Sequence, residues 1–176
     1  TNWAVAAATI QEAVDVAAPD AVVLVTNGIY NAGGKVVVGA GYNTNRVVID
    51  KPLVVASANG PYQTVIEGRW DPLTTNGLAA VRCALVISNS SLAGFTLRNG
   101  ATDTNGRGGG VIATSDALIS SCIISNNRAN SGGGADGGNF LNCWFTRNSA
   151  VSMGGAAFFV SSLNNSTAVK NSAGST

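Results

Sequence analysis

The chain has 176 residues, enough for one domain with a sizeable core, and 45% of them are apolar, which excludes a segment that is disordered for lack of hydrophobic residues. Only 11% are charged and the net charge is +1, so neither nucleic acid nor an anionic membrane is an expected partner. No apolar run approaches the roughly 20 residues of a transmembrane segment, and the lack of histidine removes the commonest general base and zinc ligand.

The first predicted element is a short amphipathic helix at about residues 9–18. Thr9 and Glu12 stand three residues apart and match a capping box, in which each side chain binds a backbone N–H at the start of the helix. Apolar residues follow at helical spacing, and Pro19 ends the helix. We interpret this helix as a cap over the first strands; an unrelated surface helix is the alternative.

Residues 20–91 alternate short apolar segments with turn signals, without a regular repeat. Ala21–Val25 is a nearly continuous apolar run, typical of a buried parallel strand, and a turn signal follows it. Similar short segments continue as far as Ile87. Because no long linker divides the chain, we predict a single domain over residues 1–176.

Residues 92–173 contain one sequence phrase four times, with a glycine cluster between the copies. The steps from asparagine to asparagine are 28, 21 and 23 residues, which indicates one supersecondary unit in each repeat. The apolar part of each copy is short and is flanked by Gly, Asn and Ser, so we expect strands that stack in parallel and bury a common core. The four copies are Ala93–Ala101, Ser121–Ala129, Asn142–Ala150 and Asn165–Ala173.

Parallel stacking would place equivalent residues of successive repeats on top of one another, about 4.7–4.9 Å apart. Asparagine tolerates left-handed backbone angles and stacked amides can hydrogen-bond to each other, so we expect an asparagine ladder at one bend. Cys122 and Cys143 would stack in the same way, as buried thiols or alternatively as a disulfide, whereas Cys83 has no evident partner. The expected ladder consists of Asn99, Asn127, Asn148 and Asn171.

Taken together, these segments resemble the right-handed parallel β-helix proteins of the pectate-lyase-like superfamily, and more narrowly bacterial secreted β-helix repeat proteins. The pairing of Phe145–Asn148 with Gly154–Ala156 is also similar to repeats of polymorphic outer-membrane proteins and autotransporter passengers. The resemblance implies an all-β fold, a single-stranded right-handed parallel β-helix or solenoid with a short N-terminal capping α-helix. Since this scaffold carries lyases, hydrolases, adhesins and structural proteins, it implies little about function. The residues that carry the resemblance are Thr9–Val14, Val23–Tyr30, Asp50–Leu53, Gly94–Gly100 and the later Asn-Cys and Gly-Gly-Gly repeats.

Enzymes on this scaffold gather acidic residues on neighbouring strands, where the carboxylates bind Ca²⁺ or act as acid and base. The nine acidic residues of this chain are dispersed. Asp116 and Asp136 come nearest to a pair, with Asp103, Arg107 and Arg128 in nearby loops, but solvated loop charges are the preferred interpretation. We therefore expect no catalytic residue, no metal site and no cofactor; a polysaccharide lyase or glycoside hydrolase is the alternative.

A second candidate site is the position before each ladder asparagine, which is basic in three of the four repeats. Stacked, Arg98, Arg147 and Lys170 would form a sparse positive stripe for an anionic glycan or a neighbouring subunit; scattered solvated charges are the alternative. Trp70 and Trp144 are candidates for stacking on sugars, although packing roles are commoner for single tryptophans.

The leading functional hypothesis is a non-enzymatic structural or adhesive module of a secreted or cell-surface protein. The last repeat has Thr167 and Ala168 where the preceding one has Trp144 and Phe145, and no capping segment follows. Either the chain is a fragment of a longer solenoid in a larger surface protein, or its last strand edges pair with a partner or with another copy, end to end in a filament. The alternative is a module that binds or degrades a polysaccharide, so the expected partners are the chain itself or an extracellular glycan.

Overall fold

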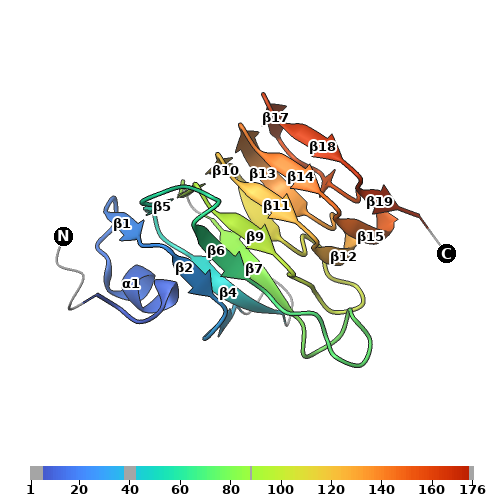
Figure 1. The fold of residues 1–176 in the computed structure, drawn as a ribbon, viewed down its shortest axis with the longest axis horizontal. Helices are drawn as coiled ribbons and strands as arrows, with labels where there is room; N and C mark the ends of the chain where they lie inside the picture. The colour runs from blue at the N-terminus through green and yellow to red at the C-terminus, as the bar shows by residue number, and fades with distance from the viewer. Residues whose placement is uncertain (1–5, 38–42, 88, 175–176) are drawn as a thin grey trace.

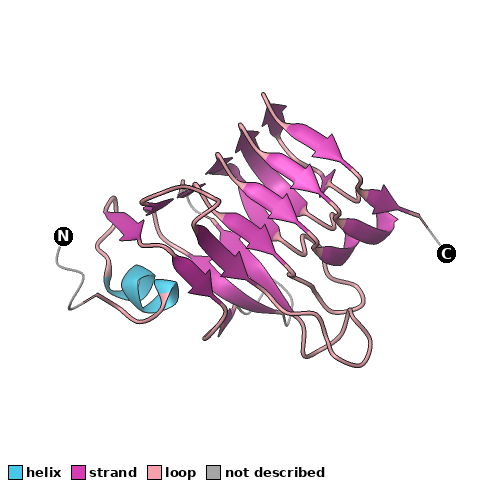
Figure 2. Cartoon of the chain, in the orientation of Figure 1, coloured by secondary structure: helices cyan, strands magenta, loops and turns pink. Residues whose placement is uncertain are grey.

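The computed structural model describes residues 6–37, 43–87 and 89–174 of the chain. One helix, α1 (Ile10–Val16), lies near the N-terminus, and the other regular elements among these residues are strands, which follow one another along the long axis (Figure 1). Figure 2 shows the same contrast between the single helix and the many short strands. Thr9 is the N-cap of α1 and Glu12 completes the capping box, so this prediction is confirmed.

Helix α1 packs on β4 (Thr44–Ile49) and covers part of its free edge. The Gln11 side-chain amide donates to the Val48 carbonyl oxygen (3.2 Å), and its Oε1 accepts from the Val48 N–H (2.7 Å). Because β3 (Lys35–Val36) pairs with β4 only at Thr44 and Asn45, Gln11 supplies the hydrogen bonds that a neighbouring strand would otherwise supply at Val48.

The largest sheet has ten strands and branches at the two longest, β10 (Val111–Ser120) and β13 (Ala135–Leu141). The beginning of β10 pairs with β7 and its end with β8, while β13 pairs with β16 and then with β17. One path through the sheet runs β1–β5–β8–β10–β7–β4–β3. Its remaining strands are β1 (Val22–Val25), β5 (Val54–Ser57), β7 (Val81–Val86), β8 (Ser91–Ala93), β16 (Ala157–Phe158) and β17 (Ser162–Asn164).

The second sheet has six parallel strands in the order β18–β14–β11–β9–β6–β2, and the third has three parallel strands in the order β12–β15–β19. Both follow the repeat, since most of their members have three to five residues and come from successive copies. The six-stranded sheet consists of β2 (Gly28–Tyr30), β6 (Thr64–Glu67), β9 (Thr96–Arg98), β11 (Ile123–Ser125), β14 (Trp144–Thr146) and β18 (Thr167–Val169). The three-stranded sheet consists of β12 (Arg128–Ser131), β15 (Ser149–Met153) and β19 (Ser172–Ala173).

This arrangement overturns the predicted fold class. A single-stranded right-handed parallel β-helix would form one uniform solenoid, whereas the described strands divide among sheets of ten, six and three strands. The largest sheet is branched, and it is also mixed, because β3 pairs with β4 in the antiparallel direction. The prediction was wrong because the repeat fixes only the register of short neighbouring strands. It specifies neither the hairpin that precedes it nor the long strands that join several partners into one sheet.

Within the repeats, equivalent apolar residues pair in register and form the core. Leu97 lies opposite Ile124, Ile124 opposite Phe145, and Phe145 opposite Ala168. Leu97, Ile124 and Phe145 are fully buried, and the ring of Phe145 packs edge to face on that of Phe140, with ring centroids 5.2 Å apart. Burying one such large apolar side chain stabilises the fold by about 1.5–3 kcal/mol, so this stack is a principal source of stability.

The glycine clusters allow neighbouring segments to approach closely. Gly132, the first of its cluster, has a left-handed backbone with φ of 63°. A Cβ on the next residue, Gly133, would lie 2.2 Å from the Ser149 carbonyl oxygen and 2.7 Å from that of Gly155. The clusters before and after this one repeat both features, so one glycine is needed for the turn and the next for the close approach.

Candidate functional site

The outward face of the six-stranded sheet carries several residues that the sequence singled out. In β11 the middle residue, Ile124, is buried, while Ile123 and Ser125 point outward and are partly exposed. In β14 the outward residues are Trp144 and Thr146. Parallel pairing aligns such residues in two rows across the face. The first row is Val65, Thr96, Ile123, Trp144 and Thr167, and the second is Glu67, Arg98, Ser125, Thr146 and Val169.

Turns with left-handed backbone angles border this face on both sides. Along one border, Asn126 Nδ2 donates to Asn99 Oδ1 (2.6 Å), and along the other, Asn165 Nδ2 donates to Asn142 Oδ1 (2.6 Å). The face therefore carries hydroxyl groups and apolar side chains between two turn borders, each with one pair of hydrogen-bonded amides. One border consists of Asn99, Asn126, Arg147 and Lys170, with φ of 55–56°, and the other of Gly94, Ser121, Asn142 and Asn165.

A second set of stacked amides lies inside the molecule. Asn127 Nδ2 donates to Asn148 Oδ1 (3.0 Å), and Asn148 Nδ2 donates to Asn171 Oδ1 (3.0 Å). The same two oxygens also accept the backbone N–H groups of Asn127 (3.0 Å) and Asn148 (2.9 Å). Asn127 and Asn148 are buried and Asn171 is half-buried, so we call these three residues the buried amide ladder.

The structure places Asn99 outside this ladder, one position from where the sequence comparison put it. Asn99 lies on the surface beside Asn126, and Gly100 takes the ladder position beside Asn127, to whose Oδ1 its N–H donates (2.8 Å). A Cβ at Gly100 would lie 2.2 Å from the carbonyl oxygen of Gly109, so no asparagine fits there. The four-residue ladder that we predicted is therefore wrong at its first member.

The one-residue shift of the first repeat also divides the three basic residues of the predicted stripe between two places. Arg98 lies in the second outward row, where its Nε donates to Glu67 Oε1 (2.9 Å), an oxygen that also accepts from Asn99 Nδ2 (2.9 Å). Arg147 and Lys170 are exposed neighbours on the turn border. The structure thus brings two of the three together and pairs Arg98 with a carboxylate instead.

Trp144 and Trp70 are similarly exposed, at 42% and 39%, but only Trp144 lies on the sheet face. A shallow pocket of about 300 Å³ adjoins its indole. The pocket thus places an exposed aromatic side chain beside several polar groups. The other residues that line the pocket are Asn142, Cys143, Asn165 and Thr167.

The three cysteines are buried free thiols. Cys122 and Cys143 lie on neighbouring repeats, and burial raises the pKa of Cys122, whose thiol also hydrogen-bonds to Cys143. As acceptor of that bond, Cys143 has a lowered pKa. Burial raises the pKa of Cys83 to about 12. Since the thiolate is the reactive form, the arrangement of Cys83 and Cys122 disfavours chemistry at neutral pH.

The acidic pair considered from the sequence does not come together. Strand pairing places Asp136 opposite Ile112, whereas Asp116 is exposed. A hydrogen bond donated by the Thr114 hydroxyl lowers the pKa of Asp116, which also accepts from the Asn89 N–H (3.1 Å). Of the loop residues grouped with them, Arg128 donates from Nε to Asn76 Oδ1 (2.9 Å) and is bound in the structure.

Asp136 lies instead near two arginines. It is only 7% exposed, and its Oδ1 has no hydrogen-bond partner among the described residues. Burial raises the pKa of this carboxyl group, and the charges of Arg107 and Arg82 oppose that effect. Arg82 is itself buried and donates to the carbonyl oxygens of Gly108 (2.8 Å) and Arg107 (2.9 Å) and to Asn45 Oδ1 (2.5 Å). Burial lowers the pKa of Arg82 to about 10, so it remains protonated at neutral pH.

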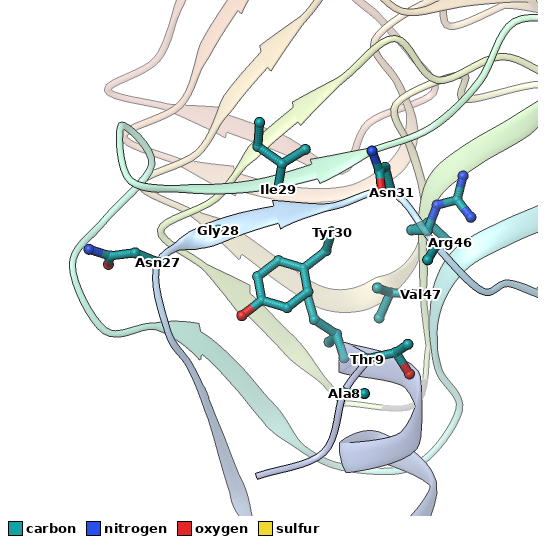
Figure 3. A pocket seen from close by; sticks show the side chains of 11 residues that line it. Ala8, Thr9, Asn27, Gly28, Ile29, Tyr30, Asn31, Arg46 and Val47 are labelled. Carbon is teal, nitrogen blue, oxygen red and sulfur yellow. The ribbon is translucent and has the colours of Figure 1, made fainter. Parts of the chain in front are cut away.

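A groove lies at the other end of the six-stranded sheet from Trp144, beside β2. It consists of two cavities of about 220 Å³ and 520 Å³ that share Asn31, Ala32 and Arg46 in their linings. Figure 3 shows the smaller cavity, with the ring of Tyr30 beside it and Asn31 and Arg46 at one end, while Ile29 projects from the opposite side of β2. We call the two cavities together the Arg46 groove.

The larger cavity of the Arg46 groove is strongly polar. Arg46, only 8% exposed, donates from Nε to the Glu67 carbonyl oxygen (2.9 Å) and from Nη1 to the Gly33 carbonyl oxygen. Burial lowers its pKa, and the charge of nearby Arg69 acts in the same direction. Arg69 is exposed and donates from Nε (3.2 Å) and Nη2 (2.9 Å) to the Ala79 carbonyl oxygen. Among the described residues, neither arginine forms an ion pair with a carboxylate.

Neither a metal-binding cluster nor a membrane-spanning helix is found among the described residues. No three His, Cys, Asp or Glu side chains in this part of the chain gather as a metal ion would require. None of its helices is long and apolar enough to cross a membrane.

Comparisons with known proteins give no assignment. No protein-family model matches this chain. Neither a curated protein nor a solved structure matches it. The family resemblance described from the sequence therefore stays a prediction, and the function has to be argued from the residues themselves.

The sequence analysis missed the Arg46 groove because its residues come from separate segments that no motif connects. One signal was present: Arg46 lies in β4 directly before three apolar residues, and Arg82 lies inside another apolar strand. Charged residues inside such strands are seldom fully buried without a partner. Charged residues in such strands therefore indicate places where a buried polar interaction or a ligand is to be expected.

Proposed function

We propose that this chain is a non-enzymatic adhesive module of a secreted or cell-surface protein, and that it holds a polysaccharide on the outward face of its six-stranded sheet. The observation that supports this is the position of Trp144. Its indole is 42% exposed on this face, beside the stacked amides of Asn142 and Asn165.

The chemistry of the face suits a sugar polymer. An exposed indole offers a large rigid apolar surface, on which the apolar face of a sugar ring can stack. The neighbouring Asn142 and Thr167 carry amide and hydroxyl groups, which both donate and accept hydrogen bonds as sugar hydroxyls do. Neighbouring strands lie about 4.7–4.9 Å apart, so a long ligand that extends from Trp144 would also meet the hydroxyl groups of Ser125, Thr146 and Thr167.

The experiment compares two tryptophans of nearly equal exposure. Native protein is run in gels that contain hydroxyethylcellulose or polygalacturonate, and the retardation is measured for the wild type, Trp144→Ala and Trp70→Ala. We expect at least one polymer to retard the wild type and Trp70→Ala, and to retard Trp144→Ala much less. Equal retardation of the two variants, or none of the wild type, would refute the proposal. An increase in ultraviolet absorbance of the polyuronate would instead indicate a lyase.

Self-association is a second candidate, supported by the open end of the core. Leu163 lies opposite the buried Phe140, and Ala168 opposite the buried Phe145, yet both are exposed. Their strands, β17 and β18, each pair with only one described strand. Light scattering over a wide concentration range tests this idea. We expect the wild type to associate and Leu163→Lys to remain monomeric, whereas a monomeric wild type would contradict it.

A further inference from the structure

We propose a second ligand site in this protein: the Arg46 groove binds an acidic oligosaccharide, with one sugar carboxylate between Arg46 and Arg69. This site lies at the β2 and β6 end of the six-stranded sheet, whereas Trp144 lies near the other end. It does not rest on the proposed function, because none of its residues lines the pocket beside Trp144, although Glu67 also belongs to the second outward row of the same sheet.

The first argument is an uncompensated charge. The larger cavity is lined by the cations Arg46 and Arg69 and by one carboxylate, that of Glu67. That carboxylate is already bound by Arg98 and Asn99 on the outer surface. The charge of Glu67 also acts on Arg46, but Arg98 shares this carboxylate, so the groove keeps an excess of positive charge, which favours an anionic ligand.

The second argument concerns Arg46 itself. A guanidinium that is only 8% exposed normally has a carboxylate partner, because burying a charge without one is costly. Arg46 uses Nε and Nη1 on two carbonyl oxygens, and its Nη2 has no partner among the described residues. Arg46 and Arg69 line the same cavity, and a guanidinium group matches the planar, bidentate geometry of a carboxylate.

The third argument is the size and lining of the groove, which indicate a sugar rather than a small inorganic anion. Its cavities of about 520 Å³ and 220 Å³ adjoin at Asn31 and Arg46, which leaves room beyond a single carboxylate. Asn31 and Thr44 offer hydrogen bonds to hydroxyl groups, and the ring of Tyr30 flanks the smaller cavity (Figure 3). Glu67 in the lining would repel a doubly charged phosphate more than a singly charged carboxylate.

Calorimetric titration of the native protein with digalacturonate, at low salt, tests the proposal. The main variant is Arg69→Gln, because Arg69 is exposed and, among the described residues, its side chain hydrogen-bonds only to the Ala79 carbonyl oxygen, so the fold should tolerate its loss. We expect this variant to bind about tenfold more weakly than the wild type, as for the loss of one charged hydrogen-bonding group. The matched control is Arg147→Gln, at an exposed arginine outside the groove, which should bind as the wild type does.

A second variant and two further ligands complete the design. Arg46→Lys keeps the charge but loses the planar fork, so it should also weaken binding. Galactobiose, which lacks the carboxylate, should not bind, and inorganic phosphate should bind more weakly than digalacturonate. The proposal is overturned if the wild type releases no heat with digalacturonate, if Arg69→Gln binds as tightly as the wild type, or if phosphate binds as tightly as the sugar. Trp144→Ala should retain digalacturonate binding, which separates this site from the polysaccharide face.

Discussion

Replacing Asn148 by alanine tests whether the buried amide ladder stabilises the fold. The side chain of Asn148 makes four hydrogen bonds: it donates to Ile124 O (2.8 Å) and Asn171 Oδ1 (3.0 Å), and it accepts from the backbone N–H and the Nδ2 of Asn127 (both 3.0 Å). The bonds to Asn127 and Ile124 are buried, and the bond to the half-buried Asn171 is partly so. The substitution therefore removes the bonds and leaves polar groups of its neighbours inside the protein.

The expected cost follows from these contacts. A typical net contribution of about 1 kcal/mol for each of four bonds, together with the buried N–H of Asn127 left without its acceptor, predicts a loss of about 3–5 kcal/mol in the free energy of unfolding. Asn171→Ala also removes four bonds, but Asn171 is half-buried and water can replace its partners. We expect a smaller loss there, about 1–2 kcal/mol.

Urea unfolding followed by circular dichroism measures both losses, with Asn59→Ala as the control. Asn59 is exposed and its side chain donates one bond, to Asn27 Oδ1 (2.7 Å), so its removal should leave the midpoint nearly unchanged. The slope of the transition has to stay constant for the comparison to hold. The reasoning is refuted if Asn148→Ala costs no more than Asn171→Ala, because burial would then not decide the worth of these amides.

Three other predictions follow from single residues. The pKa of Asp136 is raised above the ordinary value of 3.8, so the folded protein binds this proton more tightly than the unfolded chain does, and the wild type loses stability as the pH rises above 3.8 towards the raised pKa. Thermal melts should therefore show the melting point of Asp136→Asn rising relative to that of the wild type from about pH 3 to pH 7. A constant or falling difference between the two melting points would contradict this. Native protein should resist iodoacetamide at about pH 8, with Cys83 labelled only after unfolding, as mass spectrometry can show; labelling of native Cys83 would contradict its burial. Gly133→Ala should cost about 2 kcal/mol or more, since its Cβ would lie 2.2 Å from Ser149 O while its backbone angles are open to alanine; an unchanged melting point would refute the close approach.

The sequence predicted the local structure well, because local chemistry decides it. The capping box at Thr9 and the register of Leu97 on Ile124 depend on residues that recur at fixed offsets. The position of Asn99 was wrong because the repeat before Asn127 replaces the ladder asparagine by Gly100, a choice that depends on contact with Gly109 in another segment. The spacing of asparagines along the sequence does not reveal such a contact between separate segments.

The division into sheets was wrong for a similar reason. Short repeats determine which strands are neighbours, but the branching of the largest sheet depends on the length of β10 and β13, each of which reaches two partners on one side. The antiparallel pair of β3 and β4 arises outside the repeat altogether. In the candidate sites, Trp144 was recognised from its residue type, whereas Arg46 and Arg69 become neighbours only through the folding of separate segments.

The two proposed sites differ in how binding is coupled to stability. On the six-stranded sheet, the inward row of Leu97, Ile124 and Phe145 supplies the core, so the outward row can vary without loss of packing. Trp144 therefore serves binding while adding little to the fold. Arg46 is different, because the same guanidinium that would meet a ligand also binds two carbonyl oxygens inside the protein. A carboxylate in the groove would supply the partner that this buried charge lacks. Ligand binding at either site stabilises the folded state by an amount that its affinity and concentration set. The sites differ in their variants: a change at Arg46 should lower both binding and stability, whereas a change at Trp144 should lower binding alone.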